Sequence, residues 1–146
     1  MEVQNQMEVS FPSKSSNEGF ARMCVAAFVA QLDPTVEELS EIKTAVSEAV
    51  TNCIVHGYSN AIGIIKMKTS VLENGVVRIV IRDKGRGIEN VQQAMEPCYS
   101  TGGEDRAGMG FTIMESFTDS LKIKSSAGRG TTVTMKMRLS QRAGLR

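Results

Sequence analysis

The spacing of apolar residues changes along the chain, and each spacing predicts a different kind of element. Residues 7–11 alternate apolar and polar side chains before Pro12, which predicts a short strand at the edge of a sheet. Between residues 20 and 32, and again between residues 39 and 53, apolar residues recur at helical spacing. These two stretches predict two consecutive amphipathic helices.

Capping signals precede both helices. Ser15 with Glu18, and Thr35 with Glu38, have the spacing of a capping box, in which the two residues satisfy each other's backbone amides. The second helix is expected to end near Gly57, because glycine readily takes the left-handed conformation that closes a helix.

The second half of the chain reads mainly as strands. Residues 64–72 and 76–82 flank an Asn-Gly pair, which predicts an antiparallel hairpin. Residues 121–125 and 131–139 alternate in the same way about a glycine-rich turn.

A helical region interrupts these two pairs of strands. Residues 91–95 predict a short helix, residues 96–107 a mobile loop, and the apolar residues after Gly110 another short helix up to about residue 117. The expected fold is an α/β two-layer sandwich with helices against one face of a mixed, mostly antiparallel sheet.

Composition narrows the class of protein. A length of 146 residues fits one domain, and a net charge of +1 gives no overall field that would recruit nucleic acid or an anionic membrane. The three cysteines form no CxxC pair, which favours reduced thiols, and no apolar stretch approaches the roughly 20 residues of a membrane helix. We therefore expect a cytoplasmic protein without direct nucleic-acid or membrane contacts.

Polar residues in two of these elements point to one binding site. Glu48 and Asn52 are four residues apart on the second helix, so both side chains leave the same face. Asp83 ends an apolar strand, and Gly85 and Gly87 follow at alternate positions, where a backbone turns tightly or approaches a ligand. This pattern predicts a strand that leads into a binding loop.

The same residues suit phosphoryl transfer. Asn52 can offer a neutral oxygen to Mg²⁺, and a carboxylate such as Glu48 can accept the proton of an attacking hydroxyl. The helix after Gly110 can offer amides to a phosphate, and Asp83, with Thr131 beside it, can accept a hydrogen bond from an exocyclic amino group. Each motif alone is common in proteins, and only their combination is specific.

Taken together, ExxxN, DxGxG and GxG in this order resemble the Bergerat-type ATP-binding fold of DNA gyrase, Hsp90-type chaperones, histidine kinases and MutL. Residues 20–52, 108–115 and 130–133 look further like the anti-sigma-factor serine kinases, and this resemblance spans nearly the whole chain.

The resemblance implies a role for each matching residue. Glu48 would be the general base, Asn52 would bind Mg²⁺, and Asp83 would bind the adenine of ATP or ADP. The nucleotide loops would comprise Gly85, Gly87, Thr101, Arg106, Gly108, Gly110, Phe111 and Thr131. The loop at residues 100–106 lacks the lysine that usually follows a Thr-Thr pair in this family, and Arg106 is expected to substitute for it.

The resemblance also implies partners. Such a protein is a homodimer that holds a sigma factor, here one like sigma F, and phosphorylates a serine of an anti-anti-sigma protein. Arg22 matches an arginine at the partner-binding surface of the family.

Two alternative functions share this fold. In the first, ATP only orders a sigma-binding surface, although binding alone would not require a carboxylate such as Glu48 beside the metal. The second is the ATP domain of a histidine kinase, but the chain has one histidine and no preceding phosphoacceptor helix. No Walker-type phosphate-loop motif is present, which disfavours that class of NTPase.

Overall fold

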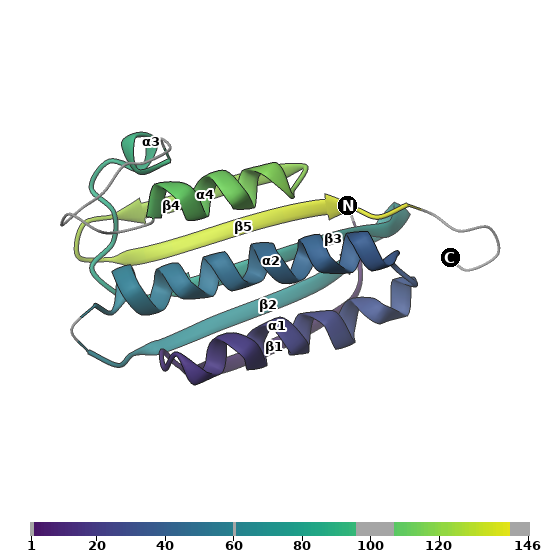
Figure 1. Ribbon diagram of the computed structural model, residues 1–146, viewed down its shortest axis with the longest axis horizontal. Coiled ribbons are helices and arrows are strands. Elements are labelled where there is room, and N and C mark those ends of the chain that lie inside the picture. Colours follow the sequence, from purple (N-terminus) through teal and green to yellow (C-terminus); the bar gives the residue numbers. More distant parts are fainter. Residues whose placement is uncertain (1, 60, 96–106, 141–146) are drawn as a thin grey trace.

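The computed structural model describes residues 2–59, 61–95 and 107–140, shown in Figure 1. The strands are β1 (Val3–Pro12), β2 (Ile64–Leu72), β3 (Val76–Asp83), β4 (Ser120–Ser126) and β5 (Gly130–Arg138). The helices are α1 (Ser16–Val29), α2 (Val36–Asn52), α3 (Val91–Ala94) and α4 (Ala107–Ser116), with short helical turns η1 (Ala30–Leu32), η2 (Cys53–Gly57) and η3 (Glu73–Gly75).

The strands form a single five-stranded sheet in the order β1-β2-β3-β5-β4, and every described pair of neighbours is antiparallel. Figure 1 shows α1, α2 and α4 running side by side across one face of this sheet. The predicted two-layer sandwich is therefore confirmed. The Asn74-Gly75 turn joins β2 to β3 with both residues at positive φ, as the hairpin signal predicts.

The hydrophobic core fills the space between the helices and the sheet. On β3, Val77, Ile79 and Ile81 are fully buried, while the alternate residues Arg78 and Val80 are partly exposed and Arg82 is exposed. Ile42, Val46 and Val50 of α2 are buried in the same cluster, at the helical spacing found in the sequence. In the described part of the chain, no helix is long and apolar enough to cross a bilayer.

The predicted capping box of α2 is present. The Thr35 hydroxyl accepts a hydrogen bond from the Glu38 amide (3.0 Å), and the Thr35 amide donates to a Glu38 carboxylate oxygen (2.8 Å). Two amides that the helix cannot satisfy internally are thereby paired. This fixes the start of the helix that carries Glu48 and Asn52.

We expect Thr35→Ala to destabilise the protein by about 1 kcal/mol, because the Glu38 amide loses its acceptor. In a protein of this size that loss lowers the melting temperature by roughly 2–4 °C, measurable by circular dichroism. Thr44→Ala is the control, since Thr44 lies within the same helix and only donates to the Ser40 carbonyl (2.9 Å). Equal melting temperatures for the two variants would show that the box does not stabilise α2.

The prediction of a capping box at the start of α1 is wrong. Ser15 has helical backbone angles and makes no capping hydrogen bond, and Glu18 instead contacts Arg22 and Ser47. Those polar partners in three dimensions compete with the local cap. The prediction for Gly57 is only half correct: α2 continues through η2 to Gly57, but Gly57 is not left-handed.

Two boundaries also differ from the sequence analysis. Strand β1 begins at Val3 rather than at residue 7, because its exposed residues still pair with β2 through backbone hydrogen bonds. Helix α4 begins at Ala107, so Gly108 and Gly110 lie in its first turn and not before it. Glycine lowers helix propensity, which hides this turn from a sequence reading. Of the loop expected at residues 96–107, residues 96–106 lie outside the described residues, and Ala107 belongs to α4.

Candidate functional site

Glu48 and Asn52 lie one helical turn apart on α2, and both are half-buried beneath α4. A Cβ atom added to Gly110 would lie 3.2 Å from Glu48 Oε1 and 3.2 Å from both the nitrogen and the oxygen of the Asn52 amide. The missing side chain at residue 110 therefore allows α4 to approach these two polar groups closely. The structure brings together the ExxxN and GxG motifs, as the sequence predicts.

Asn52 carries an unsatisfied polar atom. Its Nδ2 is buried and makes no hydrogen bond with any described residue. A buried amide without a partner is costly, so such groups commonly await a ligand or water. Asn52 also lines a cavity, which makes it a candidate for contact with a bound molecule.

Asp83 lies at the end of β3 and is only 4% exposed. Its Oδ1 accepts a hydrogen bond from the Gly85 amide (2.8 Å). The close approach of Gly57 holds the carboxylate from the other side: a Cβ at Gly57 would lie 2.9 Å from Asp83 Cγ and Oδ2. The carboxylate is thus fixed between a binding loop and the end of the α2 region.

Burial raises the pKa of the Cys53 thiol well above its ordinary value, and the negative charge of Asp83 and a hydrogen bond to Asp83 raise it further. Cys53 is therefore a neutral thiol beside Asp83.

The loop after Asp83 is clamped between two other segments. The Arg86 amide donates to the Gly57 carbonyl (2.9 Å), and the Arg86 carbonyl accepts from the Gly128 amide (2.6 Å). Gly85 and Gly87 allow this close packing, because added Cβ atoms would lie 2.0 Å from the Gly57 carbonyl oxygen and 1.9 Å from the Ser126 carbonyl oxygen. Gly87 also has a positive φ of 75°. The two glycines are required by close backbone packing, as the sequence indicates.

A cavity of about 640 Å³ lies between the α2 region, the loop after Asp83 and β5. Of the residues proposed from the sequence, it is lined by Asn52, Asp83, Gly87, Phe111 and Thr131.

Apolar side chains also line much of this cavity, and only Phe111 among them was proposed from the sequence. They are Ala49, Ile88, Ala94, Phe111, Ala127 and Val133. An apolar pocket with a few fixed polar groups is typical of sites for small organic ligands.

Asp83 and Thr131 mark one end of this cavity. They are directly opposite each other across β3 and β5, and the Thr131 hydroxyl lies 2.8 Å from that of Ser125. A fixed carboxylate acceptor beside a hydroxyl, within apolar walls, suits a flat heterocycle that carries an amino group.

The remaining predicted residues have different outcomes. Gly108 is in the first turn of α4, two residues before Gly110. Glu48 does not line the cavity but adjoins it through its contact with the Gly110 position and its place one turn from Asn52. Thr101 and Arg106 lie outside the described residues, so their predicted nucleotide contacts stay predictions.

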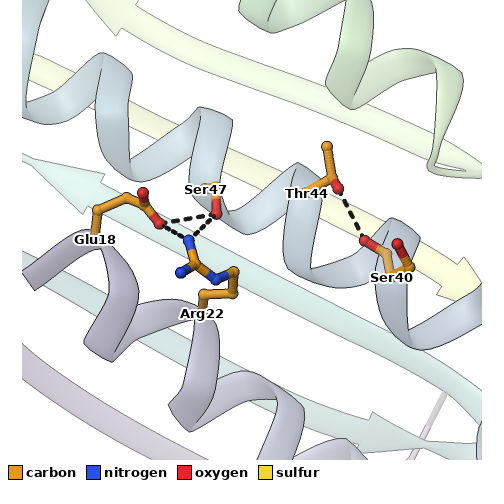
Figure 2. A network of polar contacts seen from close by, with 5 residues as sticks. All are labelled: Glu18, Arg22, Ser40, Thr44 and Ser47. Atoms are coloured by element: carbon orange, nitrogen blue, oxygen red, sulfur yellow. Dashed lines mark hydrogen bonds and ion pairs between the residues drawn. The ribbon is translucent and has the colours of Figure 1, made fainter. Parts of the chain in front are cut away.

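Arg22 lies in a separate polar network between α1 and α2, shown in Figure 2. Its guanidinium forms an ion pair with Glu18, and the Ser47 hydroxyl bonds to both, at 3.1 Å from Arg22 and 3.0 Å from Glu18. The Arg22 side chain remains 37% exposed. This network holds the guanidinium at the surface of the helical layer, one residue along α2 from Glu48.

Comparisons with known proteins agree with this geometry. The family model of the histidine kinase-like ATPase domain matches residues 11–137. The anti-sigma F factor of Caldanaerobacter subterraneus subsp. tengcongensis is 57% identical over 136 residues, which are 92% of this chain and 94% of that protein. This chain belongs to the anti-sigma F factor family. The anti-sigma F factor of Priestia megaterium is 50% identical over 98% of this chain and 99% of its own length.

A solved structure supports the fold of this anti-sigma F factor. The structure of the RsbU and RsbW domains of a Mycobacterium tuberculosis protein has a TM-score of 0.70 and 22% identity, covering 96% of this chain and 33% of that chain. Membership of the histidine kinase-like ATPase domain family implies that the protein binds a nucleotide.

Proposed function

We propose that this anti-sigma F factor is an ATP-dependent protein serine kinase that holds a sigma factor and phosphorylates the antagonist of that complex. The observation that supports the kinase activity is the position of Glu48: a carboxylate adjoins the nucleotide cavity, one helical turn from Asn52 and in contact with the Gly110 position. Binding a nucleotide does not by itself need this carboxylate. A protein kinase does need a base of this kind.

Asp83 and Thr131 would bind the adenine of ATP or ADP. The carboxylate can accept from the exocyclic amino group, and Ile88, Ala94 and Val133 supply apolar walls for the ring. The phosphates would then extend towards Asn52 and the first turn of α4, which includes Gly108 and Gly110. Backbone amides at the start of a helix favour anionic groups.

Mg²⁺ fits the same end of the site. Among the described residues, no cluster of three or more histidine, cysteine or acidic side chains could hold a metal. Mg²⁺ commonly takes one or two protein oxygens and completes its shell with phosphates and water. Asn52 lines the cavity, and its side-chain amide oxygen can supply one such ligand. When bound, Mg²⁺ would neutralise the charge that develops on the phosphates.

Glu48 would act as the general base. Its carboxylate would accept the proton of the serine hydroxyl as that oxygen forms a bond to the terminal phosphate of ATP, while the bond from that phosphate to ADP breaks and ADP leaves. The Glu48 carboxylate lies next to the Gly110 position of α4.

The partners are proposed from the family. The relatives are named anti-sigma F factors, so the bound protein would be a sigma factor like sigma F, and the serine substrate an anti-anti-sigma protein. The exposed guanidinium of Arg22, fixed by Glu18 and Ser47, is a suitable contact for an acidic group of a partner. We also propose a homodimer that acts in the cytoplasm.

One experiment tests the kinase proposal. Purified protein is incubated with γ-labelled ATP, Mg²⁺ and a candidate anti-anti-sigma protein, and the labelled residue is mapped by mass spectrometry. We expect label on a single serine of the antagonist and none when Mg²⁺ is chelated. If ATP binds by calorimetry but no label is transferred, the protein is a nucleotide-gated binding module.

A further inference from the structure

We propose that the face of the sheet opposite the helices binds the phosphate backbone of duplex DNA. Along each strand, buried side chains alternate with side chains on the outer face, and several of the latter are basic. Lys66 and Lys68 of β2, and Arg78 and Arg82 of β3, occupy alternate positions between buried neighbours that face the helices. Side chains at alternate strand positions share one face, so all four lie on the outer face.

The other two strands repeat the pattern. Lys122 and Lys124 of β4, and Lys136 and Arg138 of β5, are exposed at alternate positions. These four residues and the four of β2 and β3 are called the cationic face below. Strands β2 to β5 contain one acidic residue, Asp83, which is buried and lines the cavity. The net charge of +1 therefore hides a separation of charge, because α2 carries four acidic residues and one basic residue.

The register places like charges directly opposite each other. Lys66 is paired with Arg82 across β2 and β3, and Arg78 with Lys136 across β3 and β5. Like charges in such positions destabilise a sheet. None of these basic residues forms an ion pair with a described acidic residue, although Glu8 of β1 is paired with Lys68 at the edge of the cationic face. An anionic partner would relieve this repulsion.

The spacing suits a chain of phosphates. Basic residues two positions apart on β2, β4 and β5 are roughly 6.7 Å apart, and Arg78 and Arg82 on β3 roughly 13 Å. Lys66 and Lys124, in the same row, are separated by three strand spacings, roughly 14 Å. Thr132 lies between Arg82 and Lys124 in that row. Lysine, arginine and threonine side chains are the usual donors to phosphate oxygens in protein complexes with DNA.

A hollow at one end of the cationic face strengthens the assignment. It has a volume of about 390 Å³ and is lined by Arg82, Lys84, Lys124 and Arg129, by hydroxyl groups such as that of Ser126, and by Asp83, which also lines the larger cavity. Four cations against one carboxylate leave the hollow an excess of positive charge, which suits one phosphate.

The character of the face favours DNA over the other anionic partners. Protein interfaces usually have an apolar or aromatic centre, and a membrane surface is bound through inserted apolar residues as well as charge. On β2 to β5, one large apolar residue is exposed: Ile64, at the end of β2. No aromatic residue lies on β2 to β5, so bases of a single strand would find no stacking surface. The backbone of a duplex needs neither feature.

The test is fluorescence anisotropy of the full-length protein with a labelled DNA duplex of about 20 base pairs, between roughly 50 and 200 mM NaCl. If four phosphates are neutralised, the dissociation constant should rise roughly 100-fold over this range. The double variant Arg82→Gln/Lys124→Gln should reduce the slope of log affinity against log salt by about 2. Neither residue belongs to the nucleotide site.

The control is Lys14→Gln/Lys43→Gln, which removes the same charge outside the cationic face and should leave the dissociation constant within about twofold. Melting temperatures show that all variants are folded. The proposal is overturned if the duplex does not bind at the lowest salt, or if both double variants weaken binding equally. It is also overturned if polyglutamate or vesicles of anionic lipid bind as tightly as the duplex.

Discussion

Glu48→Ala is expected to lower the rate of phosphate transfer to the antagonist by roughly 10²- to 10⁴-fold, the usual contribution of a general base. The affinity for ATP should change by less than about threefold, because Glu48 adjoins the cavity without lining it. Single-turnover transfer of labelled phosphate measures the first quantity, and calorimetry with ATP measures the second. The separation of these two effects is what identifies a base rather than a binding residue.

Two variants control this prediction. Glu41→Ala removes a half-buried carboxylate two turns earlier on α2 and should leave the transfer rate unchanged. Glu48→Gln keeps the size of the side chain beside the Gly110 position and should be nearly as inactive as the alanine variant, since an amide does not accept a proton. A glutamine variant that retains normal transfer would refute the assignment of Glu48 as the base.

The elements that the sequence predicted best are those whose signals are local. The Thr35 capping box and the Asn74-Gly75 hairpin depend on neighbouring residues alone, and both are present. Ser15 failed as a cap because Glu18, its intended partner, bonds to Arg22 and to Ser47, a residue 29 positions away. A cap can be outcompeted by tertiary contacts that no local pattern contains.

The same distinction applies to the candidate site. Glu48 and Asn52 could be proposed from the sequence because residues four apart on a helix share one face. Asp83 could be proposed because it is a polar residue at the end of an apolar strand. Ile88 and Val133 could not, because an apolar residue that lines a cavity has the same pattern as one in the core. The glycines were recognised, but the partner that each one approaches is known only from the fold.

The cationic face was missed for a different reason. Net charge sums over the chain, whereas the field at a surface depends on which residues share a face. Lys66, Arg82 and Lys124 come from three strands that are distant in sequence, and only the register places them in one row.

Asp83→Asn is expected to weaken ATP binding by roughly 10- to 100-fold, because a hydrogen bond to a charged acceptor is worth about 1.5–3 kcal/mol. Asparagine has nearly the size of aspartate, so the packing against Gly57 is kept. Its amide oxygen can still accept from the Gly85 amide, as Oδ1 of Asp83 does. The amino group of the side chain then faces the ligand and meets the amino group of adenine, donor against donor.

Inosine triphosphate makes this prediction specific, because its ring carries a carbonyl oxygen where adenine carries the amino group. The wild-type protein should prefer ATP, and Asp83→Asn should lose or reverse that preference, since its amide can donate to the carbonyl. Asp119→Asn is the matched control: Asp119 accepts from the Arg138 amide (2.6 Å) outside the cavity and should not affect either nucleotide. General damage to the fold would weaken the binding of both nucleotides equally. Only a change in the ratio of the two affinities shows that Asp83 contacts the base. A variant that kept the wild-type preference for ATP would place the adenine elsewhere.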